Sequence, residues 1–128
     1  MAGVKLSANQ QRKVDQIQEL QRVVQKTRSV LAELESSRAA KASVINNLSG
    51  MIARELSQMR QRLLTAPVGT VGDLCGSLSI MASRSSGINM KIRGLTDGLN
   101  SIDMQLDQAL KTAMQPEKPK AGDEPAAH

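Results

Sequence analysis

The chain contains no phenylalanine, tyrosine or tryptophan among its 128 residues. Aromatic side chains normally supply the largest buried areas of a protein core, so their absence argues against a thick globular core. The apolar residues are aliphatic or methionine, and they suit the narrow contact between paired helices. A plain helical bundle with an aliphatic core is the alternative interpretation.

Cysteine, histidine and long apolar runs are also scarce. The single cysteine, Cys75, has no disulfide partner within the chain, and the single histidine, His128, is the last residue. No apolar run approaches the roughly 20 residues that span a bilayer, and the polar first residues do not match a secretory signal. We therefore expect an intracellular, cytoplasmic protein. Export by a route without a cleaved signal is left open.

No group of residues has the spacing of a catalytic or metal site. Asp103 and Asp107 lie one helical turn apart, and a solvated acidic edge explains them better than a metal site, which needs more convergent ligands. Cys75 has no base near it in the helical pattern, so it is interpreted as a small packing residue. The sequence predicts neither an enzyme nor a bound cofactor.

Positive charge is concentrated in the first half of the chain. Residues 9–65 hold ten Lys/Arg and five Asp/Glu, whereas residues 71–115 hold four of each. The basic residues are spread along the predicted helix, and no aromatic side chain is present to stack on bases. A solvated helix face is therefore favoured over binding to nucleic acid or an anionic membrane, which stays open as an alternative.

The first half has the pattern of one long helix over residues 8–65. Ser7 and Gln10 have the spacing of a capping box at its start. Pro67 ends it, because the residue before a proline disfavours the helical conformation. Apolar residues recur at heptad a and d positions and form a line called here the seam. Its residues in this half are Ile17, Val24, Leu31, Leu34, Ile45, Leu48, Ile52 and Met59.

Two basic residues, Arg38 and Lys41, interrupt this seam. The heptad phase passes through residues 36–43 without slipping, so a continuous helix is expected. Arg38 and Lys41 would then form a polar layer that sets the register of the helix against its partner. The alternatives are that both side chains reach solvent past Gly98, or that the helix breaks near residues 36–43.

The second half predicts a helix over residues 71–115. Thr70 and Asp73 have capping-box spacing, and Pro116 ends the helical pattern. Ser85 is the polar exception in an otherwise aliphatic seam. The seam residues of this half are Val71, Leu74, Leu78, Met81, Ile88, Ile92, Leu95, Leu99, Ile102 and Leu106.

The short connection at residues 66–70 makes the two helices antiparallel neighbours. The expected fold is therefore all-α, a long antiparallel helical hairpin that resembles a coiled coil. Residues 1–7 are expected to be a disordered N-terminus. Residues 116–128, rich in proline, alanine and charge, are expected to be a disordered tail.

Two features predict contact with other chains. The first helix is the longer one, so residues 8–20 would extend past their partner with apolar side chains uncovered. The back of the second helix carries glycine, serine and methionine, which allow close or adaptable contacts; the alternative is that its glycines mark a kinked or broken helix. The predicted partner-binding residues are Val14, Ile17, Leu20, Gly76, Ile80, Ser83, Gly87, Met90, Gly94 and Met104.

These patterns predict a non-enzymatic structural subunit of a multi-chain α-helical coiled-coil assembly. Its partners would be other helical protein chains, identical or different. The first alternative is a self-polymerising or exported filament subunit. The second is a basic-helix binder of nucleic acid or anionic membrane.

Overall fold

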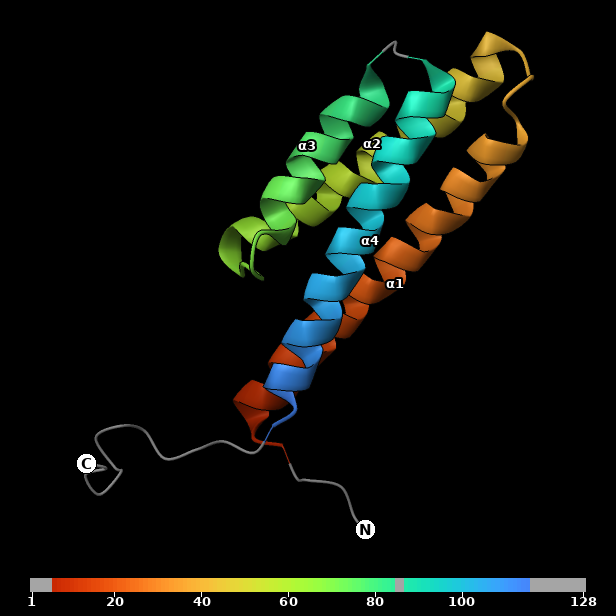
Figure 1. Cartoon of the computed structure of the whole chain (residues 1–128). Helices are drawn as coiled ribbons and strands as arrows, with labels where there is room; N and C mark the ends of the chain where they lie inside the picture. Colours follow the sequence, from red (N-terminus) through yellow and green to blue (C-terminus); the bar gives the residue numbers. More distant parts are fainter. Residues whose placement is uncertain (1–5, 85–86, 116–128) are drawn as a thin grey trace, which may run out of the picture.

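The computed structural model describes residues 6–84 and 87–115, and this part of the chain is helical without strands. It contains four helices: α1 (Ala8–Ser36), α2 (Ala42–Thr65), α3 (Val71–Ser83) and α4 (Ile88–Ala113). Figure 1 shows that they run alternately up and down, with α1 beside α4 and α2 beside α3. The predicted all-α class is confirmed. The predicted tail at residues 116–128 lies outside the described residues, as do residues 1–5.

The start of α1 is fixed by the predicted capping box. The Gln10 backbone N–H donates to Ser7 Oγ at 3.1 Å, and the Ser7 N–H donates to Gln10 Oε1 at 3.0 Å. The same Gln10 side chain donates from Nε2 to the carbonyl oxygen of Ala113 at 3.3 Å. This contact joins the first turn of α1 to the last turn of α4. Leu6, just before the helix, is partly buried and packs against the core.

The prediction of a continuous helix over residues 8–65 is wrong, and the alternative of a break near residues 36–43 is correct. The chain leaves the helix at Ser37 and re-enters it after Lys41. Arg38 and Lys41 both lie exposed in this connection, and Arg38 pairs with Glu35 in the last turn of α1 at 3.5 Å. A continuous helix would have buried two charges in the seam, which costs more than ending the helix and leaving them in water.

The predicted helix over residues 71–115 is also divided. Its first part, α3, ends at Ser83, and α4 begins after Gly87 as its N-cap. The intervening sequence is rich in serine and glycine, which are poor residues for a helix interior. Ser85, the polar seam position, lies outside the described residues. The single long hairpin is thus replaced by four shorter helices.

The connection between α2 and α3 falls at residues 66–70, as predicted. Gly69 adopts φ +49°, a left-handed conformation that favours glycine. The capping box predicted for Thr70 and Asp73 is absent, because the Thr70 side chain does not cap α3. Instead, Gln105 of α4 accepts the Thr70 N–H at 2.8 Å through Oε1. Gln16 of α1 donates to the Ala66 carbonyl oxygen at 3.0 Å, so the turn is held between α1 and α4.

The core runs through all four helices as one cluster. Among the described residues, α1 and α3 each lie against both α2 and α4, and the backbones of the diagonal pairs do not approach each other closely. The predicted seam residues that are buried in this core are Ile17, Val24, Leu31, Leu34, Leu48, Ile52, Met59, Val71, Leu78, Ile92, Leu95, Leu99, Ile102 and Leu106. Ile45, Leu74, Met81 and Ile88 are partly buried and pack against it.

The expected overhang of residues 8–20 does not exist. Val14, Ile17 and Leu20 are buried within the chain, with Ile17 at 0% exposure. The surplus length of the first half lies in α2, which has 24 residues against 13 in α3. Helices α1 and α4, with 29 and 26 residues, are nearly equal in length and lie side by side.

Candidate functional site

A largely apolar groove runs along the outside of the α3–α4 pair. It has a volume of about 420 Å³. Ile80 on α3 and Met90 on α4 are large apolar side chains beside it, with 54% and 77% of their surface exposed. We call this feature the α3–α4 groove. Its lining residues are Ser77, Ile80, Met81, Arg84, Met90 and Lys91.

Glycines on α4 allow α3 to lie close to it. A Cβ atom at Gly94 would lie 2.5 Å from the Met81 sulfur, and one at Gly98 would overlap the Leu78 side chain. Leu78 itself is buried in the core. The small residues thus serve contacts inside the fold. Gly98 faces Leu78 of α3, and Arg38 is exposed from the α1–α2 connection instead.

The predicted partner-binding residues separate into three groups. Val14, Ile17, Leu20 and Gly94 pack inside the chain, and Gly76 faces the Arg60 side chain of α2, with a Cβ–Nε distance of 3.0 Å if a Cβ were added. Ile80 and Met90 lie together at the α3–α4 groove. The third group comprises Ser83, Gly87 and Met104, which are exposed but do not line it.

A second groove lies on the other side of α3, between α3 and α2. It has a volume of about 470 Å³ and shares Ser77 and Ile80 with the first. Arg60 and Asp73, of opposite charge, lie within its lining. Ile80 therefore lines two grooves, one on each side of α3.

The charged residues that line the α3–α4 groove are both positive. Arg84 and Lys91 line it, and no carboxylate does. Neither cation forms an ion pair with any described residue. Lys91 is 5% exposed, and burial lowers the pKa of its amine. Partial removal of a lysine from water disfavours its charged form.

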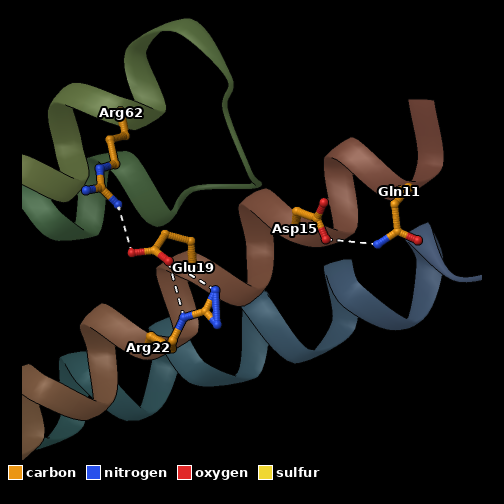
Figure 2. A network of polar contacts seen from close by, with 5 residues as sticks. All are labelled: Gln11, Asp15, Glu19, Arg22 and Arg62. Carbon is orange, nitrogen blue, oxygen red and sulfur yellow. Dashed lines mark hydrogen bonds and ion pairs between the residues drawn. The ribbon is translucent and has the colours of Figure 1, made fainter. Parts of the chain in front are cut away.

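Elsewhere, several cations of the first half are paired with carboxylates. Figure 2 shows Glu19 of α1 contacting Arg22 on the same helix and Arg62 on α2, at 3.1 and 3.7 Å. Lys26 pairs with Glu55 at 3.0 Å. The positive charge of α1 is therefore partly neutralised within the fold.

Asp103 does not belong to a solvated acidic edge. Arg28 of α1 donates from Nε to Asp103 Oδ2 at 2.8 Å, and from Nη2 to Asn100 Oδ1 at 2.7 Å. Both ionic side chains are about one-third exposed. This half-buried network links α1 to α4.

Within the described residues, no three side chains of the metal-binding types gather at one place.

Arg84 and Lys91 were missed by sequence reasoning as parts of the site. Lys91 occupies the heptad position next to Ile92 and therefore flanks the seam, which was a usable signal. Arg84 gave none, because its position depends on the break between α3 and α4.

No family model, curated protein or solved structure matched the chain. None of the helices within the described residues has the length and apolar character needed to cross a membrane.

Cys75 is fully buried, and burial raises the pKa of its thiol from 9.0 to about 11. At about pH 8 this shift alone reduces the thiolate fraction by about 100-fold, and the reagent is excluded as well. We expect a disulfide reagent to modify the folded chain at least about 100-fold more slowly than the chain in urea. Equal rates would contradict the buried position.

The same shift predicts the pH dependence of stability. Below pH 9.0 the thiol is protonated in both the folded and the unfolded chain, so it contributes no dependence. Between pH 9.0 and about 11 the unfolded chain loses the proton and the folded chain keeps it. The free energy of unfolding should therefore fall across this interval, and Cys75→Ala should reduce that fall when urea titrations are compared.

Proposed function

We propose that the chain is a non-enzymatic structural subunit of a multi-chain α-helical assembly and acts by protein–protein interaction. The observation that carries this proposal is the pair of exposed apolar residues, Ile80 and Met90, beside a groove between two helices. Isolated exposed apolar residues are common on monomers, but a contiguous apolar groove is typical of an interaction site.

The chemistry of the groove supports a helical partner. Two neighbouring helices leave a channel that accepts the apolar face of a third. Methionine is unbranched and packs against irregular surfaces, so Met81 and Met90 can adjust to an incoming side chain. We further propose that the partner completes heptad packing of the coiled-coil type against α3 and α4.

The alternatives have weaker support. A binder of nucleic acid or anionic membrane would use the positive charge of α1, but Arg22, Lys26 and Arg28 are paired with carboxylates. A self-polymerising filament subunit needs two different complementary faces on each chain. The α3–α4 groove supplies one such face, and the experiment below distinguishes a filament from a discrete complex.

Site-directed photocrosslinking in the cells that produce the chain tests the proposal. A benzophenone amino acid is placed at Ile80 or Met90, with Gln18 and Gln25, both exposed on α1, as matched control positions. We expect protein adducts of defined mass from positions 80 and 90 and none from the controls. Mass spectrometry then shows whether the crosslinked chain is identical or different. A ladder of multiples would indicate a filament.

No adduct from positions 80 and 90, or equal adducts from all four positions, would contradict the proposal. The folded state of each labelled chain is checked by circular dichroism. This check separates a lost interaction from a lost fold.

A further inference from the structure

The α3–α4 groove combines an apolar floor with positive charge and no negative charge. Ile80, Met81 and Met90 supply the apolar surface. Arg84 lies where α3 ends, and Lys91 lies in the first turn of α4. Both cations are therefore at the same end of the groove, next to the α3–α4 connection. An occupant that satisfies this arrangement needs an apolar stripe and a cluster of carboxylates.

The length of the groove bounds the occupant. Its lining residues on the α3 side run from Ser77 to Arg84, which corresponds to about 12 Å at 1.5 Å per residue. An occupant helix of two to three turns covers that length, with apolar residues three and four positions apart on one face. Carboxylates beside that face would lie next to the two cations, within the first or last turn.

We propose that the α3–α4 groove binds a short acidic amphipathic helix from a different protein chain. The apolar face of that helix packs on Ile80 and Met90, and its carboxylates pair with Arg84 and Lys91. This inference rests on the proposed function, since it names the chemistry of the partner at the same surface. It adds that negative charge on the partner helix determines whether that helix binds.

The burial of Lys91 supports this partner. The amine lies beside the apolar side chains that line the groove, and no described residue forms an ion pair with it. A carboxylate brought by the partner would stabilise the charged form, so binding would raise the pKa of Lys91. A basic partner would instead bring further positive charge to a surface that already carries two cations, which is unfavourable.

A second copy of the chain fits less well. A two-fold symmetric contact through this groove places each cation against the same surface of the other copy. That surface contains Arg84 and Lys91 and no carboxylate among its lining residues. The chain's own residues 116–128 fit no better, because they contain no leucine, isoleucine, valine or methionine to fill the apolar floor.

A membrane is also a poorer match. A bilayer accepts apolar side chains that protrude from a convex surface, and aromatic residues commonly anchor proteins at its interface. The apolar surface here is hollowed between two helices, and the chain has no aromatic residue. A helix is the convex element that fills such a hollow.

Two designed peptides test the inference. Each has about the 13 residues of α3 and leucines three and four positions apart. Each also carries a hydrocarbon staple that fixes the helix and one tryptophan at an end. One peptide has glutamates beside the leucine face, and the matched peptide has lysines at the same positions. Because the chain contains no aromatic residue, the tryptophan fluorescence reports the peptide alone.

We expect the glutamate peptide to bind the full chain at least about tenfold more tightly than the lysine peptide. The ratio should shrink as salt is added, because exposed charges are screened. Arg84→Glu should weaken binding of the glutamate peptide, whereas Arg12→Glu, which makes the same charge change at an exposed position on α1, should leave it unchanged. Ile80→Asn should weaken binding of both peptides.

Equal affinities for the two peptides would overturn the acidic partner, and so would the absence of any binding. Binding to phosphatidylserine vesicles without binding to either peptide would overturn it in favour of a membrane surface. Self-association of the chain that Ile80→Asn abolishes would overturn it in favour of a second copy. The peptide experiment tests only the acidic partner. The photocrosslinks from positions 80 and 90 test the proposed function independently of that result.

Discussion

Replacing Ile17 by alanine is expected to lower the free energy of unfolding by about 2–5 kcal/mol. Ile17 is 0% exposed and belongs to the common core, between the start of α1 and the rest of the bundle. The substitution removes buried methyl and methylene groups and leaves a cavity that neighbouring side chains fill only in part. A loss of this size is a large fraction of the stability of a small domain.

Urea unfolding followed by circular dichroism measures this loss, since the chain offers no aromatic fluorescence. Gln18→Ala is the matched control, because Gln18 is the next residue on the same helix and is exposed. It should change the free energy of unfolding by no more than about 0.5 kcal/mol. If Ile17→Ala left stability unchanged and instead weakened association with another chain, residues 8–20 would be a docking segment after all.

A methyl group at Gly98 is the second expected disruption. Gly98→Ala should destabilise the fold by about 1–3 kcal/mol, because the new Cβ overlaps the Leu78 side chain on α3. The overlap reaches the Leu78 Cγ atom, so rotation of the terminal methyl groups does not relieve it. The helix-forming advantage of alanine, about 1 kcal/mol, only partly offsets this cost.

Gly50→Ala is the matched control for this prediction. The nearest atom to its added Cβ is Arg54 Nη1 at 3.6 Å, which is an ordinary contact. We expect Gly50→Ala to stabilise the chain by up to about 1 kcal/mol, since alanine is the better helix former. Opposite signs for the two variants in urea titrations are the expected result. Two stabilising substitutions would mean that α3 does not lie against Gly98.

Much of the fold follows from local patterns. The capping box at Ser7 and the turn at residues 66–70 were predicted from residues only a few positions apart. Heptad spacing identified which faces of the chain are apolar. These signals are local, and each describes one helix at a time.

The helix breaks were harder to predict because two local signals conflicted at each. At residues 37–41 the unbroken heptad phase favoured a continuous helix, whereas the charges of Arg38 and Lys41 favoured a break. At the α3–α4 junction the aliphatic seam concealed a serine- and glycine-rich stretch. Periodicity does not include the cost of burying a charge, and that cost decided the first case.

The missed breaks also explain the errors about the site. With two long helices, the glycines of the second half pointed to a second chain, and Val14, Ile17 and Leu20 had no partner. With four helices, Gly94 and Gly98 face α3 and the N-terminal residues join the core. Ile80 and Met90 were identified as partner-binding candidates because they lie on the back of the predicted second helix, opposite its seam. Lys91 could have been identified from its heptad position beside Ile92, whereas Arg84 required the three-dimensional arrangement.

The central claim is that the four helices complete their core within one chain and leave the α3–α4 groove open. Light scattering behind size exclusion, with circular dichroism on the same peak, tests it most directly. We predict a strongly helical particle with the mass of one chain, 13.8 kDa. A purified chain that is largely non-helical, and gains helix only when other chains are added, would contradict it.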